Sequence, residues 1–345
     1  MSTQVIMSPT QDKQIPEQVL AILRCPQCGC KLGESVAGLS CGNCSREFPH
    51  VNGVIRLVDS SLYAGSFGFQ WKRYATTQLD SETSRESGLA FTRRTGFTPQ
   101  EFSGKLILDV GCGMGRFAEV ASRAGGIVVG IDLSIAAEVA ARNLAQRRNV
   151  TIFQADVFAL PFAPGSFDYI YSIGVLHHTP SCEQAFKMLP PLLKPGGKIG
   201  IWLYSGYNKW YRMSDFYRIF TTRMPKRLLH ALCYAAGPLY YLHRGLEFIP
   251  FLGRYASGML RYLLPTNPNP NFEWRVLDTF DWYSPKYQSK LTYEEVFRWF
   301  ESCGLDHLRV LYDPIAVQGT RPSEPSSAAP EALTAAGKSN YGDSF

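Results

Sequence analysis

Between residues 105 and 205 the chain alternates short apolar runs with longer stretches in which apolar positions recur at helical spacing. The runs at 106–110 and 127–131 are almost wholly apolar, as in strands that are buried on both faces of a parallel sheet. Two further strands are expected at about 307–312 and 314–319, where they would close the sheet. This alternation of strands and helices predicts an α/β fold with a Rossmann-like sheet.

The pattern changes outside this region, and the changes divide the chain into parts. Residues 205–290 lack the strand pattern and predict a helical insert, and a capping box of Thr292 and Glu295 then begins a helix that Gly304 ends. Both ends of the chain are poor in large apolar residues, which indicates disorder. The predicted parts are a disordered tail (1–19), a cysteine-rich module (20–58), a helical lead-in that covers the binding site (59–104), an α/β domain (105–319) that contains the insert (205–290), and a second disordered tail (320–345).

Composition adds a charge asymmetry to this picture. Of the 345 residues 45% are hydrophobic, which is ordinary for a globular protein, and the net charge is +6. Residues 204–290 contain 12 Lys and Arg against 5 Asp and Glu, whereas residues 291–345 contain 4 against 8. The basic excess therefore lies in the insert, unlike the even spread of a uniformly basic nucleic-acid-binding protein.

The cellular location is also predicted from composition. No run of the sequence approaches the roughly 20 apolar residues of a membrane-spanning helix. The first residues lack the basic and then apolar order of a signal peptide. We therefore expect a cytoplasmic protein.

The most informative motif is the glycine turn that follows the strand at 106–110. Gly111, Gly113 and Gly115 have the spacing GxGxG, which permits a tight turn and a close approach of backbone N–H groups to a ligand. A dinucleotide fingerprint has its third glycine where this chain has Arg116, which disfavours a nicotinamide dehydrogenase. Asp132 ends the next strand, where a carboxylate can accept both hydroxyls of a ribose. We expect a nucleoside-cofactor site; the alternative is a glycine-rich turn that only packs.

Several segments together resemble one enzyme family. LILDVGCGMGRF, FQADVFALPF, FDYIYSIGVLHHTP and LKPGG, followed by an apolar strand at 198–204, resemble in order the motifs of class I S-adenosylmethionine-dependent methyltransferases. Within that class the match is to the type 11 branch of small-molecule enzymes, which includes the ubiquinone and menaquinone C-methyltransferases. The resemblance covers residues 105–205. It implies a seven-stranded sheet, S-adenosylmethionine as cofactor, and a lid over the acceptor formed by the insert.

The resemblance also assigns roles to residues by their position. It implies that Asp132 holds the ribose of the cofactor, that Asp156 and the Val157 backbone hold the adenine, and that Ile173 lies near the sulfonium. Cys112, between two glycines, is better explained as a small buried residue than as a nucleophile. The expected cofactor-binding residues are Asp109, Gly111, Cys112, Gly113, Gly115, Asp132, Leu133, Asp156, Val157 and Ile173.

Two CxxC pairs, separated by twelve residues, predict a zinc site in the N-terminal module. Thiolates of Cys25, Cys28, Cys41 and Cys44 can complete a closed tetrahedral site, which would be structural. A small module gains from zinc the stability that its core cannot supply. The alternatives are a metal-free module and a redox-active CxxC. The stretch REFPHVNGVIRLV resembles the zinc-ribbon activator proteins of tRNA and protein methyltransferases, which implies a surface for a protein partner.

Acceptor and catalytic residues are predicted in three places. His177 and His178 follow the fourth strand, and either is a candidate base or acceptor-orienting group; the alternative is that the pair only packs. Residues 278–288, taken as a loop between helices, contain Asp281, Trp282 and Tyr283. Upstream, Trp71, Tyr74 and Arg94 are expected to cover the site, on the resemblance alone.

These observations predict a methyltransferase that acts on a small-molecule or lipid-like acceptor. The basic, aromatic insert is a candidate for contact with a membrane surface, or else a helical subdomain with its own core. One alternative is an rRNA or tRNA methyltransferase, which the absence of an NPPY-type motif after the fourth strand disfavours. A second is a catalytically silent scaffold that docks a partner through the zinc ribbon.

Overall fold

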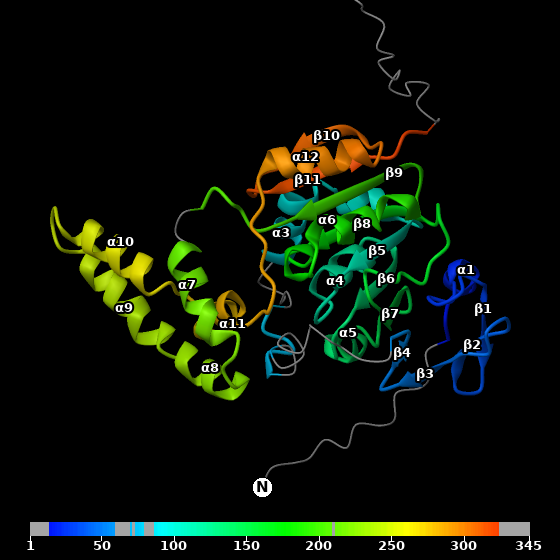
Figure 1. The fold of residues 1–345 in the computed structure, drawn as a ribbon, viewed down its shortest axis with the longest axis horizontal. Helices are drawn as coiled ribbons and strands as arrows, with labels where there is room; N and C mark the ends of the chain where they lie inside the picture. Colours follow the sequence, from blue (N-terminus) through cyan, green and yellow to red (C-terminus); the bar gives the residue numbers. More distant parts are fainter. Residues whose placement is uncertain (1–13, 59–69, 71–72, 79–85, 209–210, 324–345) are drawn as a thin grey trace, which may run out of the picture.

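The structure is a computed structural model that describes residues 14–58, 70, 73–78, 86–208 and 211–323 (Figure 1). Its strands are β1 (Leu32–Ser35), β2 (Gly38–Cys41), β3 (Glu47–Val51), β4 (Val54–Arg56), β5 (Leu106–Val110), β6 (Ile127–Asp132), β7 (Val150–Gln154), β8 (Phe167–Ile173), β9 (Leu193–Trp202), β10 (Asp306–Val310) and β11 (Ala316–Thr320). Its α-helices are α1 (Glu17–Ile22), α3 (Glu86–Thr95), α4 (Arg116–Arg123), α5 (Ala136–Asn143), α6 (Cys182–Lys187), α7 (Tyr211–Thr221), α8 (Lys226–Cys233), α9 (Ala236–Glu247), α10 (Gly253–Leu263), α11 (Phe272–Tyr283) and α12 (Tyr293–Ser302). Short 3₁₀ helices are η1 (Pro99–Phe102), η2 (Leu176–His178) and η3 (Pro190–Leu192).

The strands pair into one mixed sheet in the order β1-β2-β3-β4-β7-β6-β5-β8-β9-β11-β10. The strands from β4 to β9 in this order are parallel, and β11 lies antiparallel between β9 and β10. The seven strands from β7 to β10 form the predicted sheet, so the α/β fold class is confirmed. The predicted strands 106–110 and 127–131 are β5 and β6.

Both faces of this sheet are covered, which explains the continuous apolar runs of its strands. In β5, Leu106 and Leu108 face a core that includes side chains of α6 and α12, whereas Ile107 faces a second core with side chains of α3, α4 and α5. All five residues of β5 are buried. The carboxyl ends of the parallel strands therefore emerge between two helical layers, and ligand sites of such sheets form at that edge.

The cysteine-rich module continues the sheet. Its strands β1 to β4 pair antiparallel with one another, and β4 then pairs parallel with β7, with Ile55 opposite Phe153. Leu23 and Phe48 of the module share a core with the sheet domain. The tail predicted over 1–19 is too long, because α1 begins at Glu17 and Val19 is fully buried.

The insert is helical, as predicted, and most of it projects from the sheet domain. We call α7 to α10 the arm, and we call the cysteine-rich module with strands β1 to β4 the ribbon. Figure 1 shows the arm extending from the sheet domain at the end of the molecule opposite the ribbon. Helix α11 packs against α7, α8 and α9, and a small separate core includes Leu229, Leu277 and Phe280. Among the described residues, no helix combines the length and the apolar character that crossing a bilayer requires.

The C-terminal elements agree with the sequence pattern. Helix α12 begins after the predicted capping box, in which the Thr292 backbone N–H donates to Glu295 Oε2 at 2.8 Å. Strands β10 and β11 complete the sheet close to their predicted positions. The predicted loop at 278–288 is wrong in its first half, because α11 continues to Tyr283. Its apolar residues Val276, Leu277 and Phe280 recur at helical spacing and are buried, which outweighs the turn-forming Ser284 and Pro285 that follow.

Candidate cofactor and acceptor site

The glycine turn connects β5 to α4 at the carboxyl edge of the sheet. Gly111, Gly113 and Gly115 have φ angles of 76°, 54° and 92°, in the left-handed region that favours glycine. A Cβ on Gly111 would collide with Val175, and one on Gly115 would lie 2.7 Å from Leu144 Cδ1. The turn therefore requires glycine both for its backbone angles and for its close contacts.

Asp132 fixes the turn from the end of β6. Its Oδ2 accepts a hydrogen bond from the Gly113 N–H at 3.0 Å, and its Oδ1 accepts from the Ser134 N–H and hydroxyl at 2.8 and 2.7 Å. Burial raises the pKa of Asp132. Burial also raises the pKa of Asp109, in β5, to about 8, with a further rise from the nearby Asp132 carboxylate. Two acidic side chains thus lie near each other at the turn, Asp132 at the pocket wall and Asp109 buried behind the turn.

A pocket of about 660 Å³ opens over this turn and continues under the insert. Of the predicted cofactor residues, the structure brings seven to its wall: Gly111, Cys112, Gly113, Asp132, Leu133, Val157 and Ile173. It does not bring Asp109, Gly115 or Asp156 there; Asp109 lies buried behind the turn, Gly115 precedes α4, and Asp156 Oδ1 accepts from the Phe158 N–H at 3.0 Å.

The two predicted histidines have different positions. His178 lines the pocket, whereas His177 is fully buried behind it and stacks on Tyr204 with ring centroids 3.9 Å apart. His178 Nδ1 lies 3.0 Å from the Tyr287 carbonyl oxygen, and His178 Nε2 lies 4.0 Å from Asp281 Oδ2. Burial lowers the pKa of both rings, that of His177 most strongly. Of the pair, only His178 lies at the pocket wall.

The predicted acceptor residues are also divided by the structure. Arg94, Asp281 and Trp282 line the pocket. Tyr74 instead hydrogen-bonds His230 Nε2 at 2.7 Å, and the Tyr283 hydroxyl donates to the Pro265 carbonyl at 2.6 Å. The rings of both tyrosines pack in the small apolar core of the insert, so neither tyrosine lines the pocket. Trp71 lies outside the described residues.

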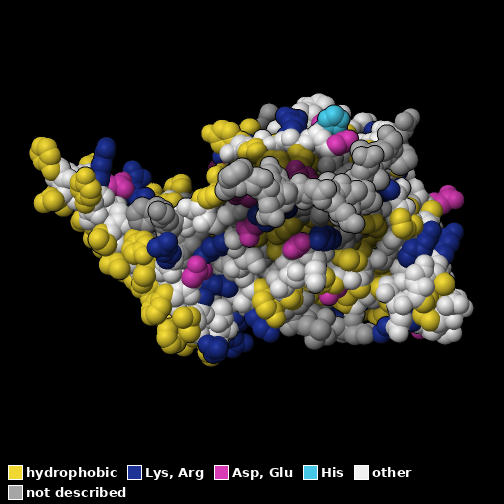
Figure 2. Space-filling model, turned by 45° about the horizontal axis from the view of Figure 1, so that its top comes forward, with side chains coloured by type: hydrophobic (Ala, Val, Ile, Leu, Met, Phe, Trp, Pro, Cys, Tyr) yellow, Lys and Arg dark blue, Asp and Glu magenta, His cyan; other side chains and the backbone are white. Residues whose placement is uncertain are grey.

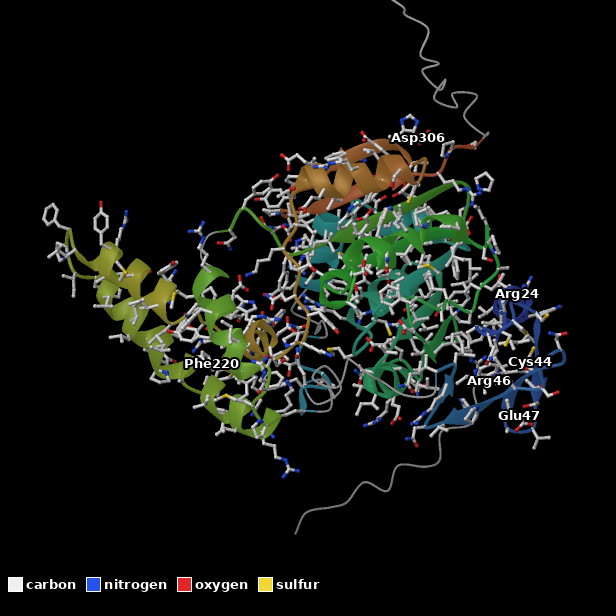
Figure 3. All side chains as sticks on the ribbon, viewed as in Figure 1. Arg24, Cys44, Arg46, Glu47, Phe220 and Asp306 are labelled. Carbon is white, nitrogen blue, oxygen red and sulfur yellow. The ribbon has the colours of Figure 1, made fainter. Side chains whose placement is uncertain are left out.

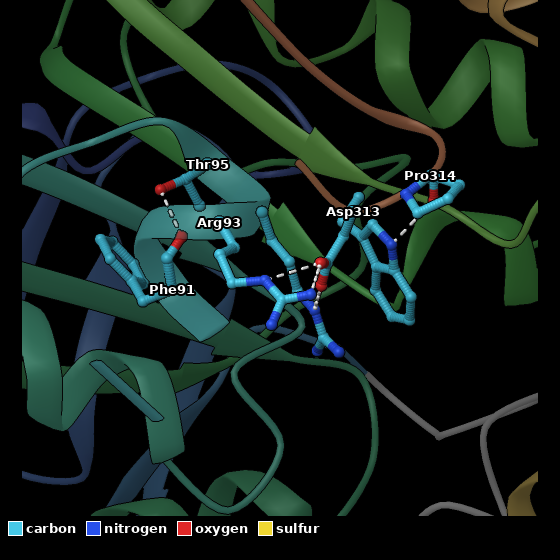
Figure 4. Close-up of polar contacts among 7 residues, drawn as sticks. Phe91, Arg93, Thr95, Asp313 and Pro314 are labelled. Carbon is cyan, nitrogen blue, oxygen red and sulfur yellow. Dashed lines mark hydrogen bonds and ion pairs between the residues drawn. The ribbon is translucent and has the colours of Figure 1, made fainter. Parts of the chain in front are cut away.

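Arg93 and Arg94 of α3 line one side of the pocket, and Figure 4 shows the contact of Arg93 with Asp313. Arg93 Nη2 lies 2.5 Å from Asp313 Oδ1, and Arg94 Nε lies 2.9 Å from Asp313 Oδ2. The Arg94 guanidinium also lies 4.0 Å from the centroid of the Trp202 ring. These contacts hold two guanidinium groups at the wall of the pocket, and both groups pair with the one carboxylate of Asp313.

Comparison with known proteins identifies the family. A family model described as a methyltransferase domain matches residues 108–201. The ubiquinone biosynthesis O-methyltransferase of Ralstonia nicotianae is 30% identical over 182 residues, which are 48% of this chain and 76% of that protein. This chain belongs to the S-adenosylmethionine-dependent methyltransferase family.

The chain has further relatives that it matches over shorter parts. The sterol 24-C-methyltransferase erg6 of Schizosaccharomyces pombe is 29% identical over 164 residues, 46% of this chain and 41% of that protein. The "Probable tRNA methyltransferase 9B" of Mus musculus is 31% identical over 145 residues, 41% of this chain and 31% of that protein. The chain therefore spans less than half the length of these two relatives.

Two polar side chains of the pocket, those of Asp278 and Tyr204, were not predicted from the sequence. Asp278 lines it from α11, and its carboxylate accepts hydrogen bonds from Asn267 Nδ2 at 2.9 Å and Gln78 Nε2 at 3.2 Å. Burial, with a smaller contribution from Asp281, raises the pKa of Asp278 to about 7. Tyr204, which follows β9, donates its hydroxyl to Asp281 Oδ2 at 2.8 Å. The helical spacing of Asp278 and Asp281 was the signal that, read as helix, places both on one face.

The four cysteines of the cysteine-rich module form one cluster, at the end of the molecule where Figure 3 labels Cys44. The Sγ atoms of Cys25, Cys28, Cys41 and Cys44 all lie within 4.8 Å of one another. Cys25 and Cys44 have Sγ atoms 3.6 Å apart, and Cys28 and Cys41 have Sγ atoms 3.4 Å apart. Zinc–thiolate bonds of about 2.3 Å in a tetrahedron separate sulfurs by ~3.8 Å. The donor set and its spacing therefore fit zinc.

Proposed function

We propose that this protein transfers a methyl group from S-adenosylmethionine to a small-molecule or lipid-like acceptor. The observation that carries the proposal is the single pocket in which the glycine turn and Asp132 meet His178, Asp281 and Trp282 from other elements. A methyl donor and an acceptor held in one pocket can be aligned for an in-line displacement, for which positioning is the main requirement. Relatives named for sterol methylation and ubiquinone biosynthesis support a lipid-like acceptor.

The cofactor half of the pocket would hold S-adenosylmethionine through backbone and carboxylate groups. Gly111 and Gly113 line this half of the pocket without side chains, and Asp132 is anchored where a ribose can be recognised. Asp109 would order the turn from behind, Val157 would flank the adenine, and Ile173 would lie near the sulfonium. The bound cofactor supplies a methyl group that its positive sulfur already activates.

The acceptor half contains a base for acceptors that must lose a proton. A carbonyl oxygen only accepts, so the contact with Tyr287 requires His178 Nδ1 to carry the proton, and the neutral ring then has its lone pair at Nε2. His178 would take the acceptor proton at Nε2. Asp281 Oδ2, 4.0 Å away, would stabilise the resulting imidazolium.

Zinc bound by the four cysteines would have a structural role. All four positions of a tetrahedral site are thiolates, so no position remains for a water or a substrate. The ribbon would then join β4 to the sheet in a fixed geometry. We also propose that a protein partner docks on this cysteine-rich module.

A tRNA acceptor is the second candidate, favoured by the tRNA methyltransferase relative and the basic insert. One assay separates the two. Purified protein is incubated with methyl-labelled S-adenosylmethionine and a cell lysate, which is then divided into solvent-extractable, small aqueous, RNA and protein fractions. Label in the first two fractions is expected. Label in RNA alone would replace the proposal with the second candidate.

A further inference from the structure

The tip of the arm exposes large apolar side chains to solvent. Residues 248–252 connect α9 to α10 at the end of the arm farthest from the sheet (Figure 1). Phe248, Phe251 and Leu252 of this tip are 82%, 96% and 73% exposed. Phe251 also has a φ angle of 62°, which is uncommon for a bulky residue. A folded protein keeps such a costly arrangement where the side chains have a use outside the chain.

The exposed apolar surface continues from the tip along the helices of the arm. On α10, Tyr255, Met259 and Leu263 recur every four residues and form one exposed stripe. The other large exposed apolar and aromatic residues between 211 and 264 are Phe216, Ile219, Phe220, Leu228, Leu232, Tyr234, Tyr241, Leu242, Ile249 and Leu264. Figure 2 shows hydrophobic side chains gathered along the arm, with Lys and Arg among them.

The same surface is strongly basic. Arg227, Arg244 and Arg254 are exposed beside the apolar residues of α8, α9 and the start of α10. Between residues 211 and 264, Asp215 and Glu247 are the only acidic side chains. Basic groups interleaved with Phe, Leu and Tyr on a projecting helical pair are the chemistry of an interfacial membrane contact.

We propose that the arm binds the surface of a membrane that contains anionic lipids, with the tip 248–252 entering the headgroup boundary. The charge argues for this occupant. An anionic surface complements the arginines, whereas a second copy of the chain would bring two equally basic arms together. The apolar tip then gains burial that no other part of the described chain offers it.

The position of the arm connects this contact to the pocket. Helix α11 packs against α7, α8 and α9, and it also supplies Asp278, Asp281 and Trp282 to the pocket wall. If the acceptor is lipid-like, a step that rests on the proposed function, the membrane is where the arm would receive it. Membrane binding can be measured without catalytic turnover, so its test does not depend on the proposed activity.

The test is flotation of the full chain, without cofactor, on vesicles of phosphatidylcholine alone or mixed with phosphatidylglycerol. A tip variant combines Phe248→Ser, Phe251→Ser and Leu252→Ser, and a charge variant combines Arg244→Gln and Arg254→Gln. A matched control combines Val36→Ser and Val310→Ser, which remove exposed apolar side chains outside the arm. All substituted side chains are exposed, so the fold should be retained.

The expected result is binding to the mixed vesicles that is at least about tenfold stronger than to phosphatidylcholine, lost in both arm variants and kept in the control. Equal or absent binding of the wild type to both vesicles would overturn the proposal. So would a concentration-dependent dimer that the tip variant dissociates, because the occupant would then be a second copy. Binding of S-adenosylhomocysteine by the tip variant, measured in parallel, separates failure of this proposal from failure of the proposed function.

Discussion

At the scale of single residues, the turn between β5 and α4 places two carboxyl groups near each other. Asp132 satisfies its oxygens with the Gly113 and Ser134 groups. Asp109 is fully enclosed, and burial raises its pKa to about 8. At neutral pH the Asp109 carboxyl is therefore mostly protonated, which reduces the electrostatic repulsion between the two side chains.

Asp109→Asn is expected to remove a pH dependence of stability. The carboxyl has a folded pKa of about 8 against 3.8 for the free group, so the folded state binds more protons between these values. Its stabilising contribution is complete below pH 3.8 and is lost as the pH rises through about 8, at up to about 1.4 kcal/mol per pH unit. In thermal unfolding between pH 5 and pH 9, the unfolding temperature of the variant should rise relative to that of the wild type as the pH increases. A constant difference would contradict the assignment.

His178→Gln is expected to lower the turnover number by about 10²–10⁴-fold if the acceptor loses a proton in the reaction. Because burial lowers the pKa of His178, the wild-type rate should stay level from pH 8 to below 6.5 before it falls. The rate of the variant should not show this decrease at low pH. His307→Gln, at an exposed position of β10, is the matched control. Turnover within a few-fold of wild type for His178→Gln would leave this ring a packing role.

At the scale of elements, the sequence predicted those whose periodicity is local. The strands β5 and β6 and the cap of α12 follow from short patterns that the structure confirms. The second half of helix α11 was missed because its buried residues are interspersed with Asp, Trp and Tyr, which suit loops and site walls alike. Asp278 was therefore not predicted as a buried pocket residue, because a carboxyl group in an expected loop gives no reason to expect burial.

The zinc proposal belongs to this scale. Elemental analysis of the purified full chain should give one zinc per molecule, lost in Cys44→Ser and retained in Cys30→Ser. Cys30 lies in the same module but outside the cluster of four, so it controls for a general effect of removing a thiol. Loss of zinc should also lower the unfolding temperature, because the metal closes the loops of a small module. Zinc-free wild type of unchanged stability would refute a structural metal.

At the scale of the whole molecule, the ribbon, the sheet and the arm form one arrangement along its long axis (Figure 1). The pairing of β4 with β7 joins segments about a hundred residues apart. Local patterns carry no information on such pairings, so the sequence predicted a separate module where the structure has a continued sheet. The same limit applies to the acceptor half of the pocket, where α3, β9 and α11 contribute residues that are distant in sequence.

The pocket as a cofactor site is the claim on which the rest depends, and calorimetric titration of the full chain with S-adenosylhomocysteine tests it most directly. One binding site per molecule is expected, with affinity reduced about 10- to 100-fold in Asp132→Ala, since a hydrogen-bonded charged group is removed. Glu183→Gln, an exposed carboxylate of α6 paired with Lys187, should bind like the wild type. Absence of binding to a folded wild-type chain would contradict the account and favour a silent scaffold.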